Sequence, residues 1–141
     1  MKKILLSIPW FSPAFKAGGP AQSVLNLVRK YNDHYSFNVV TADTDNDGTT
    51  LKIEASNQWL NLDNHISVFY CSAKSGISRL YSIFNSNRAD VLFLTGIYSF
   101  SYTILPVIVN SSPRKIISVR GMLHPPALKQ KAFKKKIFIT F

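Results

Sequence analysis

Short apolar runs recur along the chain at intervals that fit the strands of one sheet. They are rich in β-branched and aromatic residues, and most are continuous rather than alternating, which is typical of strands buried on both faces. The sequence therefore predicts five buried strands. Their positions are 3–8, 37–42, 66–71, 91–95 and 115–119.

Helical patterns lie between several of these runs. Ala21, Val24, Leu25, Val28 and Tyr31 recur at the spacing of one helix face, soon after the first strand. Strands that alternate with helices predict right-handed crossovers. The expected fold class is α/β, with a Rossmann-like, doubly wound parallel sheet.

A second helix is expected over residues 77–87, between the third and fourth strands. Its apolar face would consist of Ile77, Leu80, Tyr81 and Phe84.

Two segments depart from the regular pattern. Residues 98–110 have a weaker helical pattern, because Pro106 would kink or shift a helix there. Residues 43–64 form a long excursion with turn chemistry in "DTDNDGTT" and a weak strand or hairpin after it. We expect this excursion at the surface, as a functional loop or as a plain solvated insertion.

Length and composition limit the class of protein. With 141 residues, 46% of them hydrophobic, the chain can bury one sizeable core, so we expect a single domain over residues 1–141. Its one cysteine, Cys71, excludes an intramolecular disulfide and favours a cytoplasmic protein with a buried thiol. Apolar runs such as residues 104–109 are far shorter than the roughly 20 residues of a membrane span.

The net charge of +10 is unevenly distributed. Every acidic residue lies at or before Asp90, whereas residues 91–141 carry eight lysines and arginines. This imbalance favours an anionic partner, which could be a phosphate ligand, a membrane surface or nucleic acid. The run "KAFKKK" (131–136) could contact a membrane surface or nucleic acid, although a solvated helix face is the commoner reason for such a run.

Ligands of doubly wound sheets bind beyond the carboxyl ends of the strands. This rule selects four loops as candidate sites. They are residues 9–20, 43–50, 96–101 and 120–126.

The first loop ends in Gly18, Gly19 and Pro20. Pro20 suits the first position of a helix, which would make Gly19 the N-cap. The free N–H groups and the positive end of the helix dipole could then hold a donor phosphate, with Lys16 adding charge. Two glycines also make a tight strand-to-helix turn, so both interpretations stay open. The loop matches neither G-x-G-x-x-G nor a phosphate loop.

The fourth loop contains Arg120, Gly121 and His124. Arg120 directly follows a strand and can clamp a phosphate, while histidine is the side chain that exchanges protons most readily near neutral pH. We therefore take Arg120 and His124 as candidate catalytic residues. A surface arginine and a capping histidine are the alternative.

The third loop offers hydroxyl and aromatic groups of the kind that sugars bond to and stack on. Tyr98 and Ser99, together with Gly121, are the candidate acceptor-binding residues. Tyr98 and Phe100 could instead pack on the sheet. No metal and no cofactor are expected, since the histidines are far apart in sequence and lack cysteine partners.

Three stretches, in this order, resemble the N-terminal half of glycosyltransferase family 4, the retaining group 1 enzymes with the GT-B fold. The third stretch, residues 118–136, is similar to a loop of that family in which a hydrophobic residue, then His or Arg, then Gly-Met-Leu are followed by a Leu-Lys-Gln-Lys helix. The stretches are "GGPAQSVLNLV" (18–28), "ADVLFLTGIYS" (89–99) and "SVRGMLHPPALKQKAFKKK" (118–136).

The resemblance implies an acceptor-side, N-terminal Rossmann-like domain that faces a donor-binding domain, not contained in these residues, across a cleft. Gly18 and Gly19 match the glycine loop that approaches the donor diphosphate, and Arg120 stands where many relatives have a histidine in the catalytic site. His124 lies one turn later.

The implied reaction is retaining transfer of a hexosyl group from a nucleotide-diphosphate sugar to a glycan or lipid-linked acceptor in polysaccharide or glycoconjugate synthesis. This chain alone would be inactive. The implied partners are the nucleotide sugar, the acceptor and the inner face of an anionic membrane, which the protein would contact peripherally. Nucleic acid is not an expected partner. The alternative is a stand-alone basic α/β module that binds a membrane surface or nucleic acid.

Overall fold

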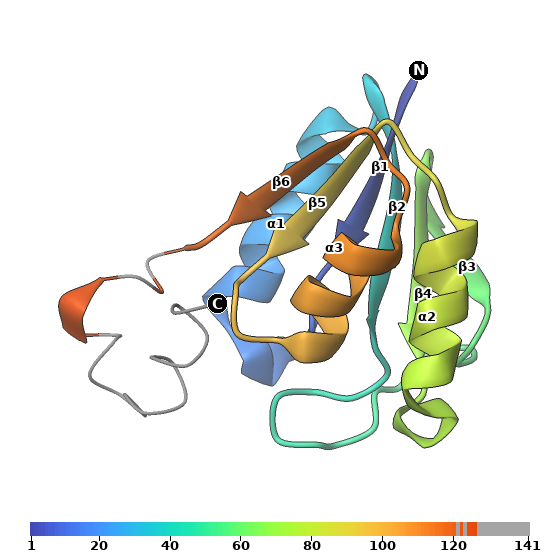
Figure 1. The fold of residues 1–141 in the computed structure, drawn as a ribbon. Coiled ribbons are helices and arrows are strands. Elements are labelled where there is room, and N and C mark those ends of the chain that lie inside the picture. The colour runs from blue at the N-terminus through green and yellow to red at the C-terminus, as the bar shows by residue number, and fades with distance from the viewer. Residues whose placement is uncertain (121, 123, 127–141) are drawn as a thin grey trace.

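The computed structural model describes residues 1–120, 122 and 124–126, and at its centre is a six-stranded sheet of order β3-β4-β2-β1-β5-β6 (Figure 1). The chain winds outward from β1 through β2 to β4, and then returns to add β5 and β6 on the other side of β1. All neighbours pair in parallel except β3, which is antiparallel to β4. The strands are β1 (Lys2–Ser7), β2 (Tyr35–Ala42), β3 (Trp59–Asp63), β4 (Ile66–Cys71), β5 (Val91–Thr95) and β6 (Arg114–Ser118).

Helices cover both faces of the sheet, which confirms the doubly wound α/β class (Figure 1). The helix α1 (Gly19–Tyr31) lies on one face, and α2 (Gly76–Ser86) and α3 (Leu105–Val109) lie on the other. None of the helices described is both long and apolar enough to cross a bilayer.

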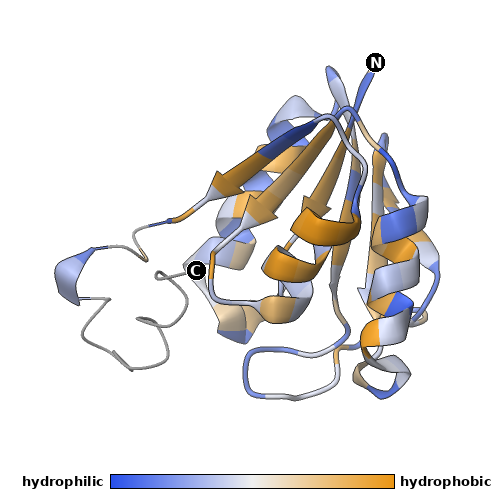
Figure 2. Cartoon of the chain, in the orientation of Figure 1, coloured by the Kyte–Doolittle hydropathy of each residue, from blue (hydrophilic) through white to orange (hydrophobic). Residues whose placement is uncertain are grey.

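The sheet separates two apolar cores. On β1, Leu5 faces the core under α2 and α3, while Leu6 faces the core under α1. On β2, Val40 faces the core under α2 and α3, while Val39 faces the core under α1. Adjacent residues of a strand point to opposite faces, so these continuous apolar runs fill both cores, as the sequence predicts (Figure 2).

The predicted helix faces are correct along most of α1 and in part of α2. In α1, Ala21, Val24, Leu25 and Val28 are buried, but Tyr31 is 41% exposed in the last turn, with the Lys30 ammonium 5.6 Å from its ring centroid. In α2, the buried residues are Leu80, Ile83 and Phe84, whereas the predicted Ile77 and Tyr81 are exposed. The buried face of this short helix is therefore narrower than predicted, and it includes Ile83 in place of Ile77 and Tyr81.

The strand β6 is located as predicted, but its burial is not. Ile116 and Ile117 point to opposite faces and are still 48% and 45% exposed. A continuous apolar run is buried on both faces only where neighbouring elements cover it. Because β6 is an edge strand, the described residues cover little of either face (Figure 2).

The excursion between β2 and β4 is more integrated than predicted. Its hairpin exists, since β3 pairs with β4, but Asp43 and Asp45 are buried rather than solvated. Leu51 and Ile53 pack against the core on the α1 side. This extended segment stands where a doubly wound fold would ordinarily place a crossover helix.

The segment after β5 shows how Pro106 shifts a helix. The turn η3 (Phe100–Ile104) is a π-helix, in which the N–H of Ile104 bonds to the carbonyl of Ser99 at 3.2 Å. The regular helix α3 begins only at Leu105, so Pro106 lies in its first turn, where the missing N–H costs little.

Candidate ligand site at the topological switch point

The strands β1 and β5 are neighbours in the middle of the sheet, with Ser7 opposite Leu94. From their carboxyl ends the chain continues to opposite faces, into α1 after β1 and into η3 and α3 after β5 (Figure 1). Such a switch point is where open α/β sheets form a crevice for ligands.

Two adjoining pockets open at this point. The larger one measures about 420 Å³ and the smaller one, toward α1, about 160 Å³. They share the residues Pro9, Trp10, Thr95, Gly96 and Met122. The larger pocket continues to Ile97, Tyr98, Ser99, Ser101 and Tyr102, and the smaller one to Ile8, Ala17, Pro20, Ala21 and Arg120.

The start of α1 differs by one residue from the prediction. The N-cap is Gly18, and Gly19 and Pro20 are the first two residues of the helix. Gly18 has φ of 69° and ψ of −143°, which a residue with a side chain rarely adopts, so the tight-turn interpretation holds for it. Apart from its chain neighbours and the adjacent helix backbone, no atom of the described residues lies within 4 Å of the position that a Cβ of Gly19 would take, so this side of the helix terminus is open among the described residues.

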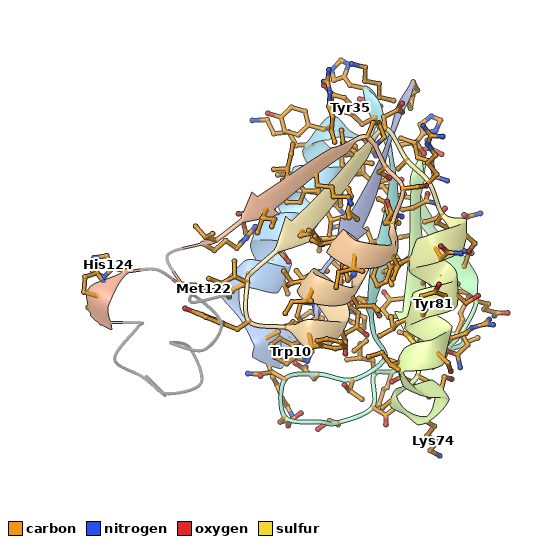
Figure 3. The ribbon with its side chains drawn as sticks, in the orientation of Figure 1. Trp10, Tyr35, Lys74, Tyr81, Met122 and His124 are labelled. Carbon is orange, nitrogen blue, oxygen red and sulfur yellow. The ribbon has the colours of Figure 1, made fainter. Side chains whose placement is uncertain are left out.

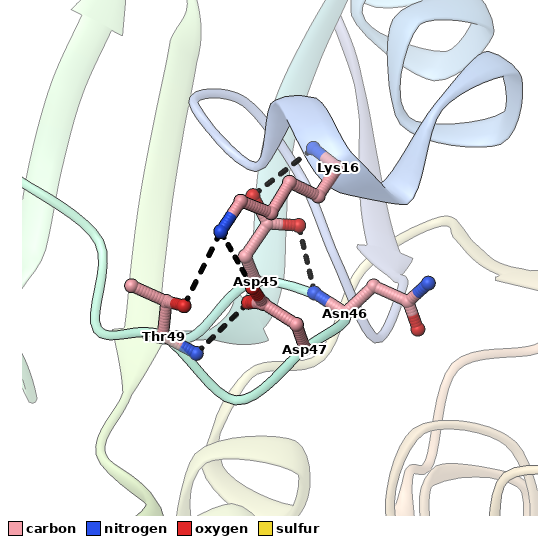
Figure 4. A network of polar contacts seen from close by, with 5 residues as sticks. All are labelled: Lys16, Asp45, Asn46, Asp47 and Thr49. Atoms are coloured by element: carbon pink, nitrogen blue, oxygen red, sulfur yellow. Dashed lines mark hydrogen bonds and ion pairs between the residues drawn. The ribbon is translucent and has the colours of Figure 1, made fainter.

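Lys16 lies in the short 3-10 helix η1 (Phe15–Ala17) and points to the 43–50 loop (Figure 4). Its Nζ lies 2.5 Å from a carboxylate oxygen of Asp47 and 3.5 Å from the Thr49 hydroxyl. The hydrogen bond between the two side chains raises the pKa of Lys16 and lowers that of Asp47. The Lys16 charge is therefore already shared with a carboxylate.

Two buried carboxylates just after β2 were not singled out by the sequence analysis. Asp45 accepts the main-chain N–H groups of Lys16 and Asn46 at 3.1 and 2.7 Å, which ties η1 to the 43–50 loop (Figure 4). Asp43 accepts the Ser56 hydroxyl at 2.8 Å. Their one sequence signal is that they follow directly on a buried strand, at the edge where ligands bind.

Arg120 reaches α1 from the end of β6. Its Nη2 donates to the Ser23 hydroxyl at 3.3 Å, and its side chain lines the smaller pocket beside Pro20. Its Nε is buried and has no hydrogen-bond partner among the described residues. The structure therefore brings Arg120 to the first turns of α1, although Gly18 lines a different pocket, next to Phe15.

Of the other two candidates in the fourth loop, the structure places only His124, which lines neither of the two pockets. His124 is exposed, and Figure 3 shows it well away from Trp10 and Met122. Gly121 lies outside the described residues, so its predicted contact with an acceptor remains a prediction.

The third loop lines the larger pocket, as its place at a strand end predicts. The Tyr98 hydroxyl donates to the carbonyl of Met122 at 3.1 Å, and the Ser99 hydroxyl caps η3 by accepting the N–H of Tyr102 at 3.1 Å. Phe100 is 54% exposed, so packing on the sheet does not explain it.

Trp10 and Met122 are pocket residues that the sequence analysis missed. Trp10 is 36% exposed and lines both pockets. Met122 is held by the third loop, because its Sδ accepts the N–H of Ile97 at 3.4 Å. At Gly96 the φ of 83° favours glycine, and a Cβ there would lie 2.9 Å from the methyl carbon at the flexible end of the Met122 side chain.

In the described part of the chain, no three His, Cys, Asp or Glu side chains gather as metal ligands. Comparison with family models, curated proteins and solved structures found no match. The pockets at the switch point are therefore the features of the molecule that bear on its function.

Proposed function

We propose that the chain is the acceptor-side domain of a retaining glycosyltransferase that uses a nucleotide-diphosphate sugar. One observation carries the proposal: Arg120, the first turns of α1 and the 95–101 loop line adjoining pockets at the topological switch point. These are the segments whose sequences resemble the family.

The proposed chemistry depends on charge that develops on the leaving diphosphate. The guanidinium of Arg120 could donate to phosphate oxygens in a fixed geometry, and the free N–H groups at the start of α1 would add to it. Donors positioned in advance stabilise developing charge at little reorganisation cost. The Nε of Arg120 has no described partner but is buried, so it would reach such an oxygen only after the side chain turns outward.

The test is sugar transfer by the purified full-length protein, with a panel of nucleotide-diphosphate sugars and glycan or lipid-linked acceptors. We expect Arg120→Ala and Gly19→Trp to abolish transfer, the first by removing the cation and the second by filling the open space beside α1. The matched controls are Gly19→Ala and Arg114→Ala, the latter an exposed arginine at the other end of β6. Unchanged turnover in both test variants would overturn the site assignment.

A second candidate function follows from charge at the opposite edge of the sheet, where the strands begin. Basic residues outnumber acidic residues there, and the acidic ones are Asp33, Asp63 and Asp90. We infer as the alternative a basic α/β module that binds an anionic membrane surface or nucleic acid. The basic residues at this edge are Lys2, Lys3, Arg29, Lys30, Arg88, Arg114 and Lys115.

This alternative requires binding that weakens steeply with salt, because each neutralised phosphate releases counterions. The measurement is a salt titration of the chain on anionic liposomes and on duplex DNA. A flat titration on both would contradict the alternative, and loss of binding in a Lys2→Ala/Arg29→Ala/Arg114→Ala variant would support it.

A further inference from the structure

We propose that the larger pocket at the switch point receives an apolar group, such as an alkyl chain or an aromatic ring, carried by the acceptor. The inference rests on the proposed function for the identity of the bound molecule as an acceptor. The lining of the pocket is what favours an apolar group.

Three of the five hydroxyl side chains that line this pocket are engaged within the protein, whereas those of Ser101 and Tyr102 have no hydrogen bond in the described part of the chain. Thr95, Ser99 and Tyr98 bond to main-chain groups at 3.3, 3.1 and 3.1 Å. A bound sugar would have to share or displace these bonds, and each buried group left unpaired costs about 1–3 kcal/mol. The hydroxyl groups of Thr95, Tyr98 and Ser99 therefore stabilise the conformation of the protein around the pocket more than they provide binding groups for a polar ligand.

The rest of the lining is apolar. Trp10, Ile97 and Met122 form walls, and none of the described residues that line this pocket carries a charge. Figure 3 shows Trp10 at the carboxyl end of the sheet, with Met122 on the segment that follows β6. A preformed apolar pocket of about 420 Å³ lies within the size range of small-molecule sites.

The walls are also held in place. The Met122 thioether accepts the N–H of Ile97, and its carbonyl accepts the Tyr98 hydroxyl, so two bonds fix this wall. Trp10 and Met122 also line the smaller pocket, and Arg120 is the one charged residue among the described residues of that lining. A molecule with its apolar group in the larger pocket would thus direct its polar end toward Arg120, where the proposed transfer takes place.

The experiment titrates the chain calorimetrically with ethyl, butyl, hexyl and octyl β-glucosides, each below its micelle concentration. We expect the affinity to rise about fourfold for each added methylene that the pocket buries, because one buried methylene contributes about 0.8 kcal/mol. Met122→Glu should abolish this dependence on chain length, and Met122→Leu should retain it. The melting temperature of each variant shows whether it is folded.

The matched control is Ile108→Glu, the same kind of change at an isoleucine on α3 that is 72% exposed and does not line this pocket. It should bind as the unmodified chain does. Equal affinity for all four glucosides would overturn the inference, and so would a dependence on chain length that survives Met122→Glu. If this dependence appears but the full-length protein transfers no sugar, the apolar pocket stands and the transferase function fails.

Discussion

Gly18 and Gly19 are adjacent, yet their backbones impose different requirements. Gly18 turns the chain with a positive φ, whereas Gly19 has ordinary helical geometry and open space around it. Only the first therefore needs to be glycine for the fold, and the second is a position at which access to the helix terminus can be changed.

We expect Gly18→Ala to lower the free energy of unfolding by about 1–3 kcal/mol, the usual cost of forcing a side chain into such a conformation. Gly19→Ala should leave it unchanged or raise it slightly, since alanine favours the helix. Urea denaturation of both variants measures the difference. Equal losses in the two would show that Gly18 does not have the strained conformation described here.

At the scale of elements, the approach to α1 is held by the 43–50 loop. Asp45 is 7% exposed and accepts two main-chain N–H groups, one of them in η1 just before Gly18. The Lys16–Asp47 pair also joins the two segments but is solvent-exposed. Exposed pairs contribute little to stability, so Asp45 carries most of this tether.

Asp45→Ala should lower the free energy of unfolding by about 1–3 kcal/mol, because it removes the charged acceptor of two part-buried main-chain N–H groups. Asp47→Ala should have little effect. Urea denaturation again provides the measurement, and amide NMR shifts at Gly18 and Gly19 report whether η1 moves. A larger loss in Asp47→Ala than in Asp45→Ala would contradict this division between the two carboxylates.

The sequence predicts which segments are strands better than it predicts what covers them. A run such as 66–71 identifies its strand without any knowledge of tertiary contacts, and the observed β4 has the same bounds. The run 115–119 looks equally buried, yet β6 is exposed, because burial depends on neighbours that the run itself does not encode. Asp45 was missed for a similar reason: the N–H of Lys16 that it accepts lies 29 residues away.

The site could be predicted only as far as topology determines it. The rule that ligands bind at the carboxyl ends of strands brings Arg120 and the start of α1 together, as the structure shows. It says nothing of where hydroxyl groups point, so Tyr98 and Ser99 look like free sugar-binding groups in the sequence. Trp10 lacked any periodic pattern that would single it out.

At the scale of the whole molecule, a buried thiol and buried tyrosine hydroxyl groups make the free energy of unfolding fall at alkaline pH. Burial raises the pKa of the Cys71 thiol from 9.0 to about 11 and that of the Tyr70 hydroxyl from 10.0 to about 12. The folded state keeps these protons at pH values where the unfolded chain has lost them. Stability contributed by Cys71 is therefore full below pH 9 and is lost as the pH rises from about 9 to 11.

We expect the free energy of unfolding to fall between pH 9 and 10 with a Cys71 contribution of up to about 1.4 kcal/mol per pH unit. Cys71→Ala should remove that contribution and leave the contributions above pH 10 of Tyr70 and Tyr102, because burial raises the pKa of both tyrosines. Urea denaturation from pH 8 to 11 compares the two proteins. Parallel curves would mean that the thiol ionises as readily in the folded state as in the unfolded chain.

The position of β1 has a consequence for how the protein is made. This strand is synthesised before the other described strands of the sheet but lies in its middle, with Ser7 opposite Val40 on one side and Leu94 on the other. On the ribosome, β1 can pair with β2 early, whereas its other edge stays open until β5 has emerged from the exit tunnel. A nascent chain that exposes an apolar strand edge for so long is prone to wrong pairing, and we expect it to be a substrate for chaperones that shield such edges.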